Sequence, residues 1–150
     1  MDPGKVIRGV FGKHPLSCIQ FGAGDEVIAA SVMSANSVSS YFLFSESSKL
    51  AVGGIEVISD SPLEYDFSSG IDLVIVDASY ELFSIVIYMA VEDLLREGGC
   101  LCICGNIQSR LSLLNTMSKE GLIAPYGKSD YDSDNIILMT MSDGKLARVF

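Results

Sequence analysis

Residues 16–24 read LSCIQFGAG, an apolar strand that runs directly into a glycine turn and then into a helix. The helix is predicted over residues 25–35, because Val27, Ile28, Val32 and Ala35 fall on one face. Glycine lacks a Cβ atom, so the backbone at a Gly-x-Gly turn can bend sharply and approach a ligand closely. This strand–turn–helix unit predicts an α/β fold with a ligand site at the turn.

Three more apolar strands end at an acidic residue or shortly before one. Strand 41–44 stops before Glu46, strand 55–58 stops before Asp60, and strand 71–76 stops at Asp77. In an open parallel sheet, ligands bind outside the carboxyl ends of the strands, so four such endings predict one site. The helix after the glycine turn would add unpaired N–H groups and the positive end of its dipole.

Each of these features also has a purely structural interpretation. The glycine turn could serve only to connect a strand to a helix, and Glu46 could be a solvated loop acid. Asp60 stands before a Ser-Pro pair and could cap a turn. Asp77 could cap the amino terminus of the helix that is expected to begin near Tyr80.

The rest of the chain alternates between helix and strand up to a final hairpin. A short helix or turn is expected over residues 5–12, whereas residues 45–54 and 61–70 favour irregular connections. The last two strands are joined by Ser142-Asp143-Gly144, and Asp-Gly between apolar runs is a strong hairpin signal. The other expected elements are a helix over 80–97 closed by Gly98-Gly99, a strand over 100–104, a helix over 107–120, and strands over 135–141 and 146–150.

Length and charge exclude several classes of protein. The 150 residues suit one domain, residues 1–150. A net charge of −9 disfavours nucleic acid and anionic membrane surfaces as partners, because phosphate binding needs clustered Lys and Arg. No apolar run approaches the roughly 20 residues of a membrane span, and no secretory signal is recognised, so a cytoplasmic protein is expected. Charged residues make up only 19%, which a homodimer with a buried interface would explain in part, and a sheet covered on both faces would explain as well.

The cysteines and the single histidine do not predict a metal site. Cys100, Cys102 and Cys104 alternate along one strand, so they are expected to be core thiols, like Cys18, in a reducing compartment. His14 lies away from the strand ends and is expected to be structural. The acidic residues 130, 132 and 134 resemble the start of a calcium loop, but the twelfth position is methionine rather than glutamate.

One more segment completes a recognisable series. Residues 93–101 read DLLREGGCL, a leucine-rich helix end, a Gly-Gly turn and a strand. With the glycine turn, the acidic strand endings and the hairpin, this segment makes residues 16–150 resemble the class I S-adenosylmethionine-dependent methyltransferases. Gly22 and Gly24 match the family's first motif, while Gln20 replaces its acid and Glu26 its third glycine. Residues 72–77, DLVIVD, match its strand-four motif.

The resemblance implies S-adenosylmethionine as cofactor and a three-layer α/β sandwich. Its sheet would be mostly parallel and seven-stranded, in the order 3-2-1-4-5-7-6, with an antiparallel hairpin as the last pair. Glu46 would bind the ribose hydroxyls, Asp60 the adenine amino group, and Asp77 would lie near the sulfonium or the acceptor. The implied reaction is methyl transfer to a small molecule or a protein, and no catalytic residue is identified. The cofactor-binding residues expected are Gln20, Gly22, Ala23, Gly24, Glu46, Asp60, Ser61 and Asp77.

Two other functions compete with this one. Gln20, Glu26 and the short region between the second and third strands favour a non-catalytic relative that serves as a ligand-binding or interaction module. An NAD-binding domain would need a glycine or alanine at position 27, where Val27 stands. The NAD-binding alternative also leaves the final hairpin unexplained.

Overall fold

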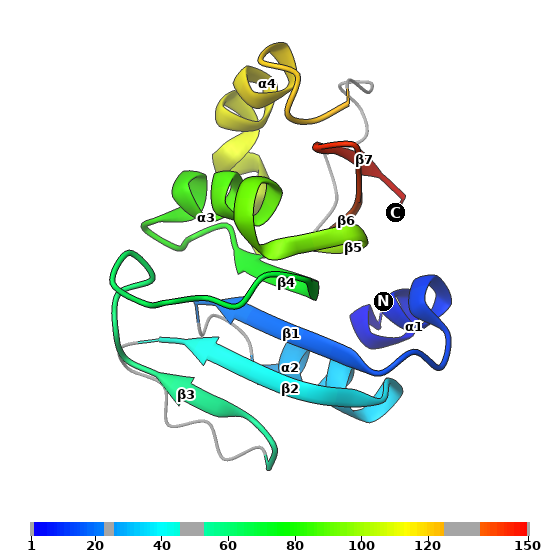
Figure 1. Ribbon diagram of the computed structural model, residues 1–150. Helices are drawn as coiled ribbons and strands as arrows, with labels where there is room; N and C mark the ends of the chain where they lie inside the picture. Colours follow the sequence, from blue (N-terminus) through cyan, green and yellow to red (C-terminus); the bar gives the residue numbers. More distant parts are fainter. Residues whose placement is uncertain (1, 23–25, 46–52, 125–135, 150) are drawn as a thin grey trace.

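Seven strands form one sheet in the computed structural model, which describes residues 2–22, 26–45, 53–124 and 136–149 (Figure 1). The order across the sheet is β3-β2-β1-β4-β5-β6-β7. The first five strands are parallel, and β6 and β7 are antiparallel to their neighbours. The strands are β1 (Leu16–Phe21), β2 (Val38–Phe44), β3 (Glu56–Ile58), β4 (Ile71–Asp77), β5 (Leu95–Cys104), β6 (Ile136–Ser142) and β7 (Lys145–Arg148). The predicted α/β class is confirmed.

Helices cover the two faces of the sheet and give it two apolar cores. One face carries α1 (Pro3–Phe11) and α2 (Glu26–Ala35), whose residues Ile7 and Val32 pack with Leu73 of the central strand. The other face carries α3 (Phe83–Met89), the π-helical turn η1 (Ala90–Leu94), the 3-10 turn η2 (Ile107–Arg110) and α4 (Leu111–Lys119). Strand β4 lies between these layers and is buried along its whole length, as its continuous apolar run predicts.

The helix after β4 is shorter than the sequence predicts. It ends at Leu94, and β5 begins at Leu95, so Gly98 and Gly99 lie within the strand rather than at a helix cap. The pairing of β4 with β5 shifts there, because Ile71 pairs with Leu95 but Leu73 already pairs with Cys100. A Cβ atom at Gly99 would lie 2.9 Å from the Arg96 carbonyl oxygen. The Gly-Gly pair is therefore needed for a bulge in the strand.

The predicted order of the last three strands, 5-7-6, is wrong. Strand β6 pairs directly with β5, from Cys100 opposite Thr140 to Cys104 opposite Ile136, and β7 lies outside it. The physical reason is burial: five residues of β6 are buried, whereas β7 buries only Leu146. A strand covered on both faces must be apolar, so β6 takes the inner position. On the outer side, Leu146 forms a parallel bridge with Ile123.

The hairpin turn between β6 and β7 is confirmed. Asp143 has a φ of 51° and Gly144 a φ of 75°. Positive φ at both central residues belongs to the two-residue turn that matches the twist of antiparallel strands. Ser142 pairs with Lys145 on either side of the turn.

The four cysteines are free thiols buried in the core, as predicted. Burial, with a smaller effect of the Asp72 charge, raises the pKa of Cys18 to about 12. Burial also raises the pKa of Cys102 well above its ordinary value. The thiolate is the reactive form, so at about pH 8 we expect a thiol reagent such as Ellman's reagent to react with Cys18 about a thousandfold more slowly than with an unfolded thiol.

The labelling experiment has an internal reference. In denaturant, all four thiols should react rapidly, and the time course in native buffer should be limited by unfolding. Fast release of the chromophore from the native protein would contradict the burial of these residues.

The described parts of the chain contain no helix that is both long and apolar enough to cross a membrane. In those same parts, no three His, Cys, Asp or Glu side chains are placed to hold a metal ion. The acidic residues 130, 132 and 134 lie outside the described residues.

Candidate functional site

The glycine turn at the end of β1 meets the end of β4. Strands β1 and β4 are direct neighbours, with Phe21 paired to Val76, so Gly22 and Asp77 follow at the same edge of the sheet. Gly22 has a φ of 91°, and its N–H donates to the carbonyl oxygen of Phe44 at 3.0 Å. A Cβ atom at Gly22 would lie 3.3 Å from the Asp77 Cβ and 3.4 Å from the Tyr80 Cδ1.

The carboxylate of Asp77 lies between two glycine turns. Asp77 pairs with Cys104 at the end of β5 and is only 8% exposed. The residue that follows β5, Gly105, has a φ of 87°, and a Cβ atom there would lie 3.1 Å from the Asp77 Oδ2. The glycines at positions 22 and 105 thus leave room for this carboxylate at the carboxyl ends of three neighbouring strands.

Asp77 also stabilises its own loop. Its Oδ1 accepts hydrogen bonds from the Ser79 N–H, at 2.9 Å, and from the Ser79 hydroxyl. This is the local turn that Asp side chains commonly form with the backbone two residues later. Helix α3 begins only at Phe83, and its N-cap is Leu82, so Asp77 is not the cap of that helix.

Arg110, which the sequence analysis did not single out, holds the loop after Asp77. Its Nε donates to the carbonyl oxygen of Ala78 at 2.6 Å, and a terminal nitrogen donates to that of Tyr80 at 2.8 Å. Its guanidinium lies 4.9 Å from the centre of the Phe83 ring, a cation–π contact. The sequence contains only ten Lys and Arg residues, and this scarcity is the only feature of the sequence that could have indicated a role for Arg110.

Gln20 lies beneath the turn, inside the core. It is 2% exposed. Its Oε1 accepts a hydrogen bond from the Tyr41 hydroxyl, and its Nε2 donates to the carbonyl oxygen of Gly22 at 3.1 Å. Both ends of the amide therefore bind protein groups, and the side chain supports the glycine turn from within.

Asp60 and Ser61 lie at the other end of the predicted site, beyond the edge strand β3. Asp60 is exposed. The Ser61 Oγ accepts from the Leu63 N–H at 3.3 Å, and its carbonyl oxygen accepts from Glu64 at 3.0 Å, so Ser61 closes a turn. Because β2 separates β3 from β1, strands β3 and β1 lie about 10 Å apart across the sheet. Ala23, Gly24 and Glu46 lie outside the described residues.

Aromatic side chains connect the two ends of this edge. Phe21 stacks on Phe44, with ring centres 5.1 Å apart, and lies 6.0 Å from Tyr80. Phe44 also contacts Tyr65 and Phe67, each at 5.1 Å. Tyr65 and Phe67 belong to segment 61–70, which the sequence predicts to be irregular. Their aromatic side chains within a polar loop are the feature of the sequence that could have indicated this contact.

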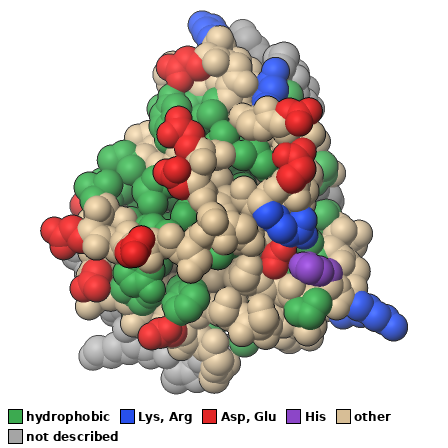
Figure 2. All heavy atoms as spheres, viewed as in Figure 1, with side chains coloured by type: hydrophobic (Ala, Val, Ile, Leu, Met, Phe, Trp, Pro, Cys, Tyr) green, Lys and Arg blue, Asp and Glu red, His purple; other side chains and the backbone are tan. Residues whose placement is uncertain are grey.

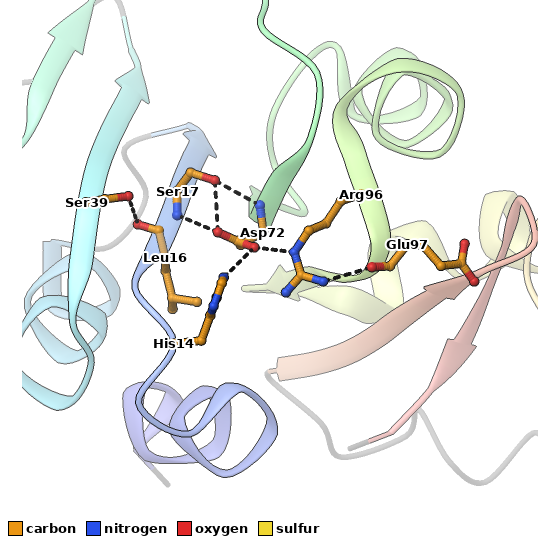
Figure 3. A network of polar contacts seen from close by, with 7 residues as sticks. All are labelled: His14, Leu16, Ser17, Ser39, Asp72, Arg96 and Glu97. Carbon is orange, nitrogen blue, oxygen red and sulfur yellow. Dashed lines mark hydrogen bonds and ion pairs between the residues drawn. The ribbon is translucent and has the colours of Figure 1, made fainter.

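A second polar cluster lies at the opposite edge of the sheet, around Asp72 near the start of β4 (Figure 3). Its carboxylate accepts from the Ser17 N–H at 2.9 Å, the Ser17 hydroxyl at 3.1 Å and the Arg96 Nε. The His14 Nε2 lies 3.2 Å from the Asp72 Oδ1. The cluster joins β1, β4 and β5 at their amino ends, so His14 has the structural surroundings expected of it.

Several solved structures with this fold are methyltransferases, and these are of different kinds. The ribosomal protein L11 methylase of Lactobacillus delbrueckii subsp. bulgaricus has a TM-score of 0.63 and 14% identity, over 93% of this chain and 76% of that one. The N-methyltransferase NodS of Bradyrhizobium japonicum has a TM-score of 0.57 and 13% identity, over 91% of this chain and 90% of that one. A Streptococcus mutans protein crystallised in complex with SAH has a TM-score of 0.59 and 14% identity, over 92% of this chain and 93% of that one.

These similarities show the fold. No protein-family model matches the chain, and no curated protein sequence matches it. The chain has the fold of the class I S-adenosylmethionine-dependent methyltransferases, as the resemblance in its sequence implied.

Proposed function

We propose that the protein binds S-adenosylmethionine, or its demethylated product SAH, at the carboxyl ends of β1 and β4, and that it transfers the methyl group to a small molecule or a protein. One observation carries the proposal. The glycine turn at Gly22, the buried carboxylate of Asp77 and the glycine turn at Gly105 meet at the ends of three adjacent central strands. Ligands of open parallel sheets bind at such a place.

The described residues fit this cofactor. Gly22 has no side chain, so a ligand can approach its backbone closely, whereas a Cβ atom there would lie only 3.3 Å from the Asp77 Cβ. The exposed carboxylate of Asp60 can accept hydrogen bonds from amino or hydroxyl groups, and Ser61 lies beside it. On the resemblance, Gln20, Ala23, Gly24 and Glu46 would complete the site.

For methyl transfer, the protein has to contribute mainly the position of the reactants and a suitable charge near them. The cofactor supplies a methyl group on a positively charged sulfonium, which is already activated for transfer. Asp77 places a negative charge beside the glycine turns, and Arg110 fixes the loop from Ala78 to Tyr80 through two hydrogen bonds. Holding an acceptor in line with the methyl group accounts for much of the catalysis in such a transfer.

Gln20 supports the alternative of a non-catalytic ligand-binding or interaction module. It stands where the family carries an acid, and its amide is bonded to Tyr41 and to the Gly22 carbonyl oxygen inside the core. A protein of this kind would keep the fold without transferring a methyl group.

Calorimetric titration with S-adenosylmethionine and with SAH tests the proposal. We expect heat of binding for the wild type and binding at least about tenfold weaker for Asp60→Asn, because a hydrogen bond to a charged acceptor contributes about 1.5–3 kcal/mol. Asp93→Asn is the matched control, since Asp93 is an exposed carboxylate on η1. Its affinity should equal that of the wild type.

Activity then separates the two functions. Binding together with methyl transfer to any acceptor supports the enzyme, and binding without transfer to a broad acceptor panel supports the non-catalytic module. Absence of heat at millimolar cofactor, with the protein folded by circular dichroism, would remove the cofactor proposal.

A further inference from the structure

The sheet face over β1 and β2, opposite α1 and α2, is covered by a loop instead of a helix. Residues 59–70, which connect β3 to β4, contain only turns and bends. Figure 1 shows this connection as the green segment that arches from β3 to β4 at the left of the view. Between the loop and the sheet lies a hollow, here called the aromatic groove, lined chiefly by Ile19, Phe42, Phe44, Tyr65, Asp66 and Phe67.

The wall of the aromatic groove consists of packed aromatic rings and is only half-buried. Tyr65 lies edge-on to Phe44 with ring centres 5.1 Å apart, and Tyr65 and Phe67 are 4.9 Å apart. Such aromatic pairs stabilise one another beyond the area they bury. Phe42, Tyr65 and Phe67 nevertheless remain partly exposed, so their rings are accessible to a ligand.

Acidic side chains surround these rings. Asp66 lines the groove and is exposed. Glu56 pairs with Phe42 in the parallel β2–β3 ladder, so both side chains point to the same face, and the exposed Glu64 directly precedes Tyr65. On the left of Figure 2, hydrophobic side chains lie among acidic ones.

No basic residue offsets this charge within the surrounding segment. Residues 50–95 contain no Lys or Arg. The exposed acidic residues of the same segment are Glu56, Asp60, Glu64, Asp66, Glu81, Glu92 and Asp93. A surface of one sign attracts partners of the opposite sign and repels like-charged ones. Because the whole chain carries a net charge of −9, a second copy is a poor occupant of this face.

We propose that the aromatic groove binds a basic segment of a partner protein. The segment inserts an apolar side chain between Phe42, Tyr65 and Phe67 and places a Lys or Arg beside Asp66. Buried aromatic contacts supply most of the binding energy in such interfaces. The acidic rim and the ring faces select for cations. The proposal does not depend on cofactor binding.

Fluorescence anisotropy with a designed peptide tests it. The probe is fluorescein-labelled Gly-Lys-Phe-Lys-Lys-Leu-Lys-Gly, titrated with the full chain at low ionic strength. One control peptide carries Ser in place of Phe and Leu, and the other carries Glu in place of Lys. We expect saturable binding of the probe and at least about tenfold weaker binding of both controls.

Matched variants test whether the peptide probe binds in the aromatic groove. Asp66→Lys and Asp93→Lys each change the net charge from −9 to −7, so only the position of the charge differs. Tyr65→Ser is paired with Leu63→Ser, because Leu63 is 62% exposed in the same loop but does not line the groove. Asp66→Lys and Tyr65→Ser should weaken binding about tenfold, and the two controls about twofold or less.

Three results would overturn the proposal. Equal loss in Asp66→Lys and Asp93→Lys would show attraction to net charge alone. Equal affinity of Tyr65→Ser and Leu63→Ser, both folded by circular dichroism, would place the probe elsewhere. A dimer in sedimentation that Tyr65→Ser abolishes would assign the groove to a second copy. Asp66 is exposed, so Asp66→Lys remains informative if Tyr65→Ser does not fold.

Discussion

Replacing Gly4 with alanine is expected to destabilise the protein by about 3 kcal/mol. A Cβ atom at Gly4 would lie 2.1 Å from the carbonyl oxygen of Ser31 and 2.5 Å from its carbonyl carbon. Both are backbone atoms of α2, so no side chain can move aside, and α1 must shift away from α2. That shift would also break the hydrogen bond from the Gly4 N–H to the Ser31 Oγ, which is 2.8 Å long.

The measurement is the free energy of unfolding in urea, with Gly9→Ala as the control in the same helix. No atom lies within 4 Å of a Cβ at Gly9. Alanine is the better helix former, so Gly9→Ala should raise stability by about 0.5–1 kcal/mol. The same substitution, five residues apart, is thus expected to have opposite signs. Equal effects of the two variants would show that α1 does not contact α2 as described.

Replacing Arg96 with methionine is expected to cost about 2–3 kcal/mol near neutral pH. Removing one partner of a buried ion pair costs about 3–5 kcal/mol. Arg96 is 37% exposed, so water compensates part of that loss. Asp72 would retain its two hydrogen bonds from Ser17 and its contact with His14. The control is Lys13→Met, which removes an exposed positive charge directly before His14 in the sequence. It should change the free energy of unfolding by less than about 0.5 kcal/mol.

The pH dependence of this loss has a definite sign. Burial alone would raise the pKa of Asp72, but hydrogen bonds from Arg96 and Ser17 outweigh it and hold that pKa below its usual range. A carboxyl group whose pKa is lower in the folded state contributes stability above its unfolded pKa, about 3.9, and loses it as the pH falls through the folded value.

The difference between wild type and Arg96→Met should therefore be largest above about pH 5 and should shrink below about pH 4. Urea unfolding of both proteins across this range measures it. A difference that stays constant down to the acid unfolding transition would show that the Asp72 carboxylate is not the group involved.

The glycine turn and the hairpin show what could be predicted locally. Gly22 and Gly144 have positive φ values, which glycine adopts at little cost. Both could be predicted, because each glycine stands in a turn that comes after an apolar strand in the sequence. The strand endings at Phe21 and Asp77 were also predictable, because a continuous apolar run marks a strand buried on both faces. Their meeting at one edge then followed from the parallel sheet.

Other assignments required contacts between distant parts of the chain. The expected place of Gln20 at the cofactor stays a prediction, but its hydrogen bond to Tyr41, twenty-one residues away, could be seen only in the fold. A buried amide must satisfy its donors and acceptors. Asp72 was assigned to a sequence motif, and only the fold shows Arg96 and His14 on its carboxylate. Neither partner can be inferred from spacing.

The sequence by itself determined the alternation of strands and helices, the glycine turn and the hairpin, since each follows from local periodicity and backbone preference. Only the tertiary structure decided that β6 lies inside β7, that Arg110 holds the loop after Asp77, and that Tyr65 and Phe67 form a groove over the sheet. The physical reason is that strand order and side-chain partners depend on competition for burial among segments far apart in the chain.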